Sequence, residues 1–233
     1  MAVTWTEVNS KLDQFLDDAP RYNAAGDLIT PLFVEVLRIE SWNWAQRILV
    51  HHTPRARTTP LTLQASEREA ILPDDFFALQ GLYDADNERW WRPVDWEPGD
   101  VRYADDDSER YWIFAGRLYL EKDVDVDSTD FTLYYWAYYP DVEYTVDDDG
   151  NVDTYKQDRV YTPRWAEPAM GHLTTVHCMM PKEVFASDIN QYKIRVDSGN
   201  PMHNPRQQSV LHHLDMWNRL IGLFPPARLE TVS

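Results

Sequence analysis

The chain has 233 residues, of which 43% are hydrophobic and 13% aromatic. This length supports one sizeable core, or a core with a small inserted domain, and the aromatic content excludes a disordered chain. No apolar run approaches the roughly 20 residues that a membrane span needs. The first residues lack the basic and apolar regions of a signal peptide, so we expect synthesis in the cytoplasm.

The net charge of −17 is concentrated in the middle of the chain, because residues 84–158 hold 22 acidic and 7 basic residues. Nucleic-acid binding requires Lys and Arg to neutralise phosphates, so this segment does not favour a phosphate-gripping role. It suits a path along which nucleic acid slides without sticking, because like charges repel. The alternative is a solubilising acidic face. The single cysteine, Cys178, excludes an internal disulfide and a cysteine-based zinc site.

Two helices are predicted in the first third of the chain. Thr4 and Glu7 fit a capping box at a helix start. Thr30 and Pro31 fit an N-cap followed by proline at the first helical position, which predicts a second helix from about Pro31 to about Val50. Apolar residues at helical spacing give the first helix one stripe, formed by Val8, Leu12, Phe15 and Leu16.

The middle of the chain has the pattern of β-strands. Tyr111–Phe114 and Arg117–Leu120 flank an Ala-Gly pair, which predicts a tight hairpin because glycine accepts a positive φ. The segment Phe131–Tyr139, FTLYYWAYY, is the strongest predicted strand. A second hairpin is predicted where Tyr144–Val146 and Val152–Tyr155 flank an acidic turn. An antiparallel meander is the simplest topology.

Three further helices are predicted in the last third. Thr162 and Pro163 repeat the cap-and-proline pattern. The apolar stripes then indicate helices over 165–180, 185–196 and 205–224.

This order predicts an α+β fold, an antiparallel helical bundle with an inserted antiparallel β domain. We expect N-terminal bundle helices over 1–58 and the inserted β domain over 59–160. The C-terminal bundle helices should cover 161–224, with a tail over 225–233.

No catalytic constellation is visible in the sequence. It lacks a P-loop, a dinucleotide-binding glycine fingerprint and a nucleophile elbow. His172 and His177 are five residues apart, off one helical face, and the adjacent His212 and His213 should point apart at surface or flanking positions. We therefore predict no enzyme activity, no cofactor and no metal site.

The acidic turns resemble the start of a calcium-binding loop. Asp147, Asp149 and Asn151 fit its first half, but Val152 stands where that loop needs glycine and Asp158 where it needs a bidentate Glu. We expect these acids to serve turns and solvation.

The predicted strand 131–139 is apolar or aromatic on both faces, whereas a strand with one wet face alternates with polar residues. Tyr and Trp suit interfaces because they combine large rigid area with a polar tip. Tyr134, Trp136 and Tyr138 share one face and are our candidates for a subunit interface. An intrachain sandwich and a sugar-stacking platform are the alternatives.

Three features together resemble the head-to-tail adaptor (connector) family of tailed phages. The first is the element LPDDF, Leu72–Phe76, with the strand Ala78–Tyr83. The second is the hairpin YWIFAGRLYL, Tyr111–Leu120, followed by the aromatic strand Phe131–Pro140. The third is the closing pair of helices, over 163–180 and 205–224, after paired helices at the start. The resemblance spans roughly residues 5–224.

The resemblance implies a homo-oligomeric ring, typically of twelve subunits, that docks under the portal protein at the head-tail junction of the virion. Such a ring extends the DNA channel, lets DNA pass without specific binding, and receives a tail or nozzle protein. It implies that the C-terminal segment, here with Phe224 and Arg228, contacts the portal. The helix over 182–196 and the acidic stretch 84–108 depart from the family pattern.

Two other classes remain as alternatives. A carbohydrate-binding, host-recognition module shares the aromatic β signal but does not need the amphipathic helices. A small acid-catalysed hydrolase requires a carboxyl group with a raised pKa in an apolar pocket.

Overall fold

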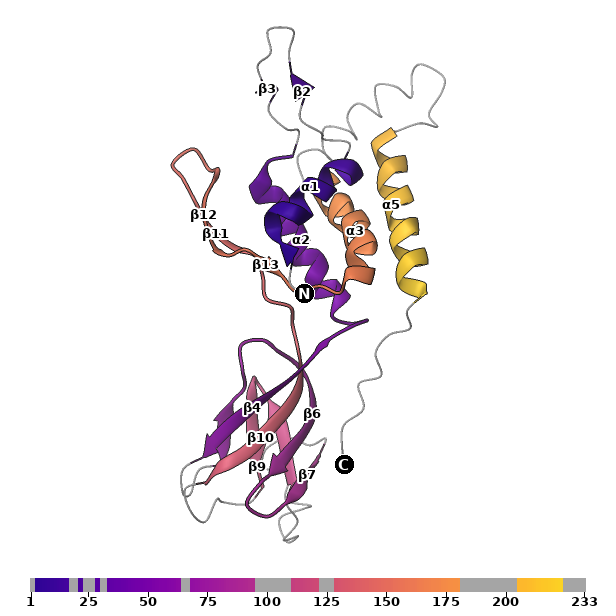
Figure 1. Cartoon of the computed structure of the whole chain (residues 1–233). Coiled ribbons are helices and arrows are strands. Elements are labelled where there is room, and N and C mark those ends of the chain that lie inside the picture. Colours follow the sequence, from indigo (N-terminus) through magenta and orange to yellow (C-terminus); the bar gives the residue numbers. More distant parts are fainter. Residues whose placement is uncertain are drawn as a thin grey trace. The chain divides into compact units, whose positions relative to one another are not determined.

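The computed structural model describes residues 3–16, 21–22, 28–29, 33–63, 68–94, 110–121, 128–180 and 205–223. The chain forms two compact units. We call Met1–His52 with Tyr139–Pro226 the helical unit, and Thr53–Tyr138 with Ala227–Ser233 the sheet unit (Figure 1). No helix in these described ranges is long and apolar enough to cross a membrane.

The predicted capping box starts the first helix of the helical unit, α1 (Trp5–Leu16). The Thr4 backbone N–H donates to the Glu7 carboxylate at 3.2 Å, and the Glu7 N–H donates to the Thr4 hydroxyl at 3.4 Å. This reciprocal pairing satisfies backbone donors that have no partner inside the helix. The predicted apolar stripe of α1 is confirmed for Val8, Leu12 and Leu16, which are buried together with Trp5, whereas Phe15 is only half-buried.

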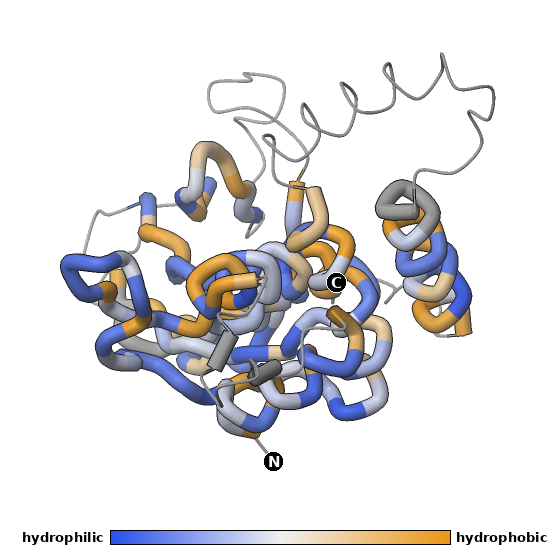
Figure 2. Tube along the Cα trace, turned by 90° about the horizontal axis from the view of Figure 1, so that it is seen from above, coloured by the Kyte–Doolittle hydropathy of each residue, from blue (hydrophilic) through white to orange (hydrophobic). Residues whose placement is uncertain are grey.

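The other helices gather around α3 (Glu167–Met179), which follows a short 3₁₀ turn at Arg164–Ala166. The elements that pack on α3 are α1, α2 (Glu35–Leu49) and α5 (Pro205–Gly222). Figure 2 shows α5 at the side of this group. Their shared core contains the edge-to-face pair Trp5–Trp42, whose ring centroids are 6.2 Å apart.

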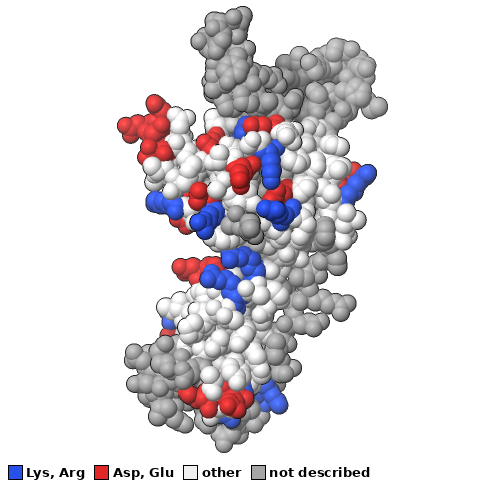
Figure 3. All heavy atoms as spheres, in the orientation of Figure 1, with Lys and Arg blue, Asp and Glu red and all other residues white. Residues whose placement is uncertain are grey.

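Three two-stranded sheets accompany these helices. They pair β1 (Val3–Thr4) with β13 (Arg159–Val160), β2 (Arg21–Tyr22) with β3 (Leu28–Ile29), and β11 (Glu143–Val146) with β12 (Val152–Gln157). The β11–β12 pair is the predicted acidic hairpin, and acidic side chains gather at its tip (Figure 3).

The sheet unit contains one seven-stranded sheet in the order β4-β10-β6-β7-β8-β9-β5. The bounds are β4 Arg55–Leu63, β5 Glu69–Ile71, β6 Phe76–Asp84, β7 Arg89–Pro93, β8 Arg110–Phe114, β9 Arg117–Leu120 and β10 Ser128–Ala137. The predicted hairpin between β8 and β9 is confirmed. Its turn residues Ala115 and Gly116 have φ of 48° and 77°, and the left-handed region favours glycine there.

The sheet curls around its own core, and its edge strands β4 and β5 touch. The inward side chains come from β4, β6, β7, β8, β9 and β10, and from the first residue of the LPDDF element. They are Leu61, Leu63, Leu72, Leu82, Trp91, Tyr111, Leu118, Leu120, Phe131, Leu133, Tyr135 and Ala137. Within the described part of the sheet unit, the curled sheet therefore buries its apolar face on itself.

The predicted fold class, a helical bundle with an inserted antiparallel β domain, is wrong. The fold is mixed and strand-rich, with four α-helices in the described part of the chain. The sheet is not an antiparallel meander, since β7 and β8 pair in parallel and β10 lies between β4 and β6. The second helix also starts later than predicted, at Glu35. The predicted helix over 182–196 lies outside the described residues.

The reason for this error is that apolar stripes show which helix face is buried but not what covers it. Strands supply part of the covering here, because Tyr144 of β11 and Val152 of β12 pack against the helical core.

Candidate functional site

The residues predicted to form a subunit interface lie on the outer side of the sheet, at β10. Tyr134 and Trp136 alternate with Leu133 and Tyr135, and Tyr138 directly follows the strand. The inward pair is at most 2% exposed, whereas all three predicted interface residues are half-buried. The alternation expected from the sequence is confirmed, and their role in an interface stays a prediction.

Aromatic rings of β6 and β7 lie beside the predicted interface residues on the outer side of the sheet. Tyr83 of β6 contacts Trp90 of β7 at 5.2 Å between ring centroids, and Trp90 contacts Tyr134 at 5.1 Å. Phe77 contacts Tyr138 at 5.2 Å. We call this surface the outer aromatic face; it comprises Phe77, Tyr83, Trp90, Tyr134, Trp136 and Tyr138.

Sequence reasoning did not identify Phe77, Tyr83 and Trp90 as part of this surface. The signal for Trp90 was the pair Trp90-Trp91, since adjacent strand residues point to opposite faces and Trp91 is 5% exposed in the core. The pairing of β6 with β7 and β10, which brings the rings together, is not visible in the sequence.

Asp75 of the LPDDF element holds the end of β10 in place. Its carboxylate accepts a hydrogen bond from the Tyr135 hydroxyl at 2.9 Å and pairs with the Arg57 guanidinium at 2.6 Å. Its backbone carbonyl accepts the Tyr138 N–H at 2.8 Å. Burial, and then the contact with Asp75, raise the pKa of Tyr135. Asp75 thus fixes the end of the strand that carries Tyr134 and Trp136 and is followed by Tyr138.

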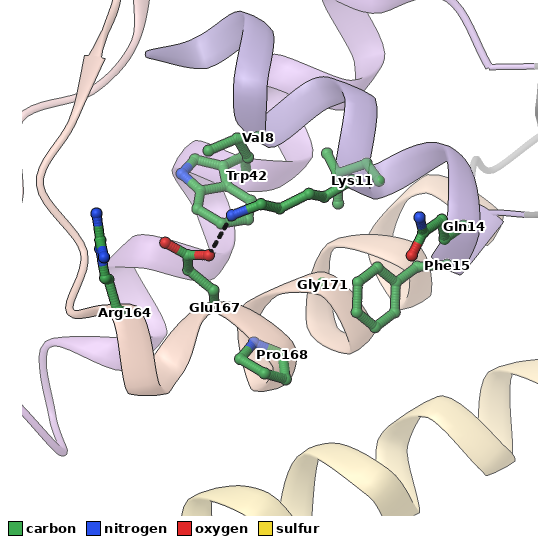
Figure 4. Close-up of a pocket in the computed structure, with 10 residues that line it drawn as sticks. Val8, Lys11, Gln14, Phe15, Trp42, Arg164, Glu167, Pro168 and Gly171 are labelled. Atoms are coloured by element: carbon green, nitrogen blue, oxygen red, sulfur yellow. Dashed lines mark hydrogen bonds and ion pairs between the residues drawn. The ribbon is translucent and has the colours of Figure 1, made fainter. Parts of the chain in front are cut away.

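A second candidate surface is a groove between α1 and α3 in the helical unit (Figure 4). It contains a cavity of about 220 Å³. Side chains of α1, α2 and α3 give it an apolar lining, which includes Val8, Leu12, Phe15, Trp42, Pro168 and Gly171. We call this cavity with its polar extension toward the start of α1 the α1–α3 groove. The extension is lined by Val3, Thr6, Glu7, Ser10, Lys11, Arg164 and Glu167.

Charged groups border the apolar cavity. Lys11 of α1 and Glu167 of α3 form an ion pair at 2.6 Å across the groove. Arg164 is exposed, and no carboxylate in the described part of the chain pairs with it. The groove therefore contains an apolar cavity with the Arg164 guanidinium beside it.

Gly171 allows Phe15 to lie against α3 at the cavity. A β-carbon at this position would stand 2.6 Å from the Phe15 ring, inside van der Waals contact. The close approach of α1 to α3 thus depends on a residue without a side chain.

Ser41, His177 and Cys178 form a hydrogen-bonded network between α2 and α3. The Ser41 oxygen lies 2.9 Å from His177 Nδ1, and the Cys178 thiol donates to it at 3.2 Å. The Ser41 hydroxyl donates to the Leu37 carbonyl at 2.6 Å, and Ser41 is fully buried. A buried hydroxyl whose hydrogen is engaged by the backbone is a packing group rather than an activated nucleophile.

The prediction that His212 and His213 occupy surface or flanking positions is wrong for His213, which is 9% exposed. His213 Nδ1 of α5 lies 2.7 Å from His172 Nδ1 of α3. Burial, and then the neighbouring histidines, lower the pKa of His213 to about 4. The prediction failed because α3 and α5 pack against each other here, and the residue pattern of one helix does not show which helix it will contact. Within the described ranges, His, Cys, Asp and Glu form no group of three that could hold a metal.

The acidic turn of β11–β12 has the turn role expected of it. The Asp147 carboxylate accepts the backbone N–H groups of Asp149 at 3.0 Å and Asn151 at 2.7 Å. The predicted portal-docking residues, Phe224 and Arg228, lie outside the described residues.

Compared with known proteins, the chain matches no protein-family model and no curated protein sequence.

Proposed function

We propose that this chain is a structural virion protein, a head-to-tail adaptor subunit of a tailed phage that works as one copy in a ring. The observation that carries the proposal is the outer aromatic face. The curled sheet already encloses its own core, yet it presents Tyr83, Trp90 and Tyr134 on its other side.

This surface differs from an ordinary solvated sheet face. Such a face would alternate with polar residues, because water contact favours them. Protein interfaces are instead enriched in Tyr and Trp, whose rigid rings bury large area at low entropic cost. Neighbouring copies in a ring supply a covering for that area, and closed rings are a common form of homo-oligomer.

The remaining parts of the proposal extend from the resemblance. The ring docks on the portal protein at the head-tail junction, with Phe224 and Arg228 as its portal contacts, and it receives a tail or nozzle protein. DNA passes through without specific binding, which the net charge of −17 favours. Assembly takes place in the host cytoplasm.

A carbohydrate-binding module is less well supported by the same surface. Adjacent rings in the row Tyr83–Trp90–Tyr134 are tilted by 56° at each contact, and Phe77 and Tyr138 by 70°. These rings thus pack on each other's edges. The nearly parallel pair on the outer side is Trp112 with Tyr119, whose planes differ by 9°, and it is the feature that favours the carbohydrate alternative.

The test is assembly on the portal protein of the same phage. Mixed with that portal, the wild-type chain should form rings visible by negative-stain microscopy. A Trp90→Ala/Tyr134→Ala double variant, and Trp136→Ala, should stay folded by circular dichroism but fail to form them. Phe114→Ala is the matched control, since Phe114 is 50% exposed and belongs to the same sheet but not to the outer aromatic face. Normal rings from the double variant would refute the interface, and glycan binding by isolated protein would favour the alternative.

A further inference from the structure

The α1–α3 groove has the size and chemistry to receive one apolar side chain with a neighbouring carboxylate. Its apolar cavity has about 220 Å³ and its polar extension about 790 Å³, so one apolar side chain fits the cavity while the polar residues beside it fit the extension. Lys11 and Arg164 line the groove together with Glu7 and Glu167. Glu167 pairs with Lys11, and Glu7 accepts the Thr4 N–H, so Arg164 is left without a carboxylate partner among the described residues. The groove therefore fits a protein segment that is both apolar and acidic.

The β11–β12 hairpin is such a segment, and it stands out from the helices (Figure 1). Its base is fixed to α2, because the Tyr155 hydroxyl donates to Glu35 at 2.5 Å and the Tyr144 hydroxyl to Glu40 at 3.5 Å. At its tip, Val146 is 52% exposed, and three acidic residues, Asp147, Asp148 and Asp149, follow it.

We propose that the β11–β12 hairpin is an arm that docks into the α1–α3 groove of a second copy of this chain. Val146 enters the apolar cavity, and the Asp148 carboxylate faces Arg164 of the receiving copy.

Three observations favour a second copy as the occupant. The tip has three acidic residues, and on the groove Arg164 has no carboxylate partner among the described residues, so the charges are complementary at Arg164 although Glu7 also lines the groove. Within one chain, no residue of the hairpin lines the groove. Hairpin and groove are also different surfaces, so each copy gives an arm to one neighbour and receives one from the other. This head-to-tail pattern closes into a ring when the rotation between copies allows it. The inference rests on the proposed function only in requiring self-association.

Charge exchange tests the contact between the arm and the groove. Asp147 makes the turn bonds and Gly150 has the positive φ of 80°, so replacing Asp148 leaves the turn intact. Asp148→Arg and Arg164→Glu should each weaken ring assembly on the portal about tenfold, because like charges then meet. Combining both changes in one chain should restore assembly. Arg219→Glu, an exposed charge reversal on α5, should leave assembly unchanged.

Crosslinking provides a readout that does not need the portal. A chain with Asp148→Cys is mixed with a chain carrying Arg164→Cys and treated with a short bismaleimide; the native Cys178 is fully buried. Crosslinked dimers should form in the mixture and not with either variant alone.

The outcomes separate the two proposals. Absence of dimers in the mixture, or single reversals that assemble like wild type, would overturn the arm contact while leaving a ring in place. If wild-type rings do not form on the portal, the proposed function fails, and the crosslink alone then decides whether the arm docks.

Discussion

The two units bury their apolar residues in different ways. The helical unit mixes polar groups into its core, where Arg38, Ser41, Gln46 and Thr174 are each at most 4% exposed. The curled sheet has a core of apolar and aromatic side chains, with Asp84 as the buried charged residue among those described, and it places further aromatic rings on its outer side. The comparison teaches that a large apolar residue is not by itself a sign of burial, because in the sheet unit the same residue types occupy both faces.

The largest expected effect is a difference in the free energy of unfolding between substitutions on the two faces of β10. Leu133→Ala removes a fully buried side chain and should reduce the free energy of unfolding by about 3–4 kcal/mol. Tyr134→Ala, one residue later on the outer face, should cost about 1 kcal/mol or less, because its side chain is only half-buried. Urea unfolding of both variants measures the difference. Equal losses would mean that the outer aromatic face belongs to the core of a single copy.

Acidification should weaken the helical unit through the α3–α5 contact. The pKa of His213 is lowered to about 4, and burial and His212 also lower the pKa of His172. The folded state therefore binds fewer protons than the unfolded state between pH 6.5 and 4. Stability from this site is complete above pH 6.5 and falls as the pH drops through that window, by about 2 kcal/mol for His213 between pH 7 and 5.

Urea unfolding at pH 7, 6 and 5 checks this slope. In His213→Gln, which cannot titrate, the loss should shrink, whereas the exposed His212→Gln is a matched control that should retain most of it. A wild-type slope that His213→Gln leaves unchanged would assign the pH dependence to other groups.

An effect of similar size should follow from replacing Arg38, the buried cation of the helical unit. Arg38 is 4% exposed, pairs with Asp13 at 2.7 Å and donates to Asn9 at 2.9 Å. Arg38→Met should cost about 2 kcal/mol, below the range for a fully buried pair, because Asp13 is partly exposed and regains water. Arg57→Met, which breaks the more exposed Arg57–Asp75 pair of the sheet unit, should cost less. A larger loss from Arg57→Met would reverse this ranking of the two ion pairs.

The smallest loss in the free energy of unfolding should come from a substitution in the α1–α3 groove, Gly171→Ala. Gly171→Ala places a β-carbon 2.6 Å from the Phe15 ring, but the ring is half-buried and can turn outward. The clash is partly offset by the higher helix propensity of alanine, so the net loss should be about 1 kcal/mol. Thermal unfolding measures this loss. In a chain that already carries Phe15→Ala, Gly171→Ala should cause no further loss of stability. A loss that persists in the double variant would point to a backbone clash.

Local patterns in the sequence determined the local structure of this protein. The capping box at Thr4 and Glu7, the Ala-Gly hairpin and the alternation along β10 follow from bonds and angles within a few residues. The alternation along 131–139 likewise predicted that Tyr134, Trp136 and Tyr138 share one face.

The tertiary structure alone decided which faces meet. The parallel pairing of β7 with β8, the position of β10 beside β4, the His172–His213 contact and the α1–α3 groove each join residues from separate parts of the chain. Hydrophobic burial is non-directional, so a sequence pattern specifies that a face is covered but not by which partner. For that reason the sequence predicted a bundle with an insertion, whereas the chain folds as a helical unit and a curled sheet.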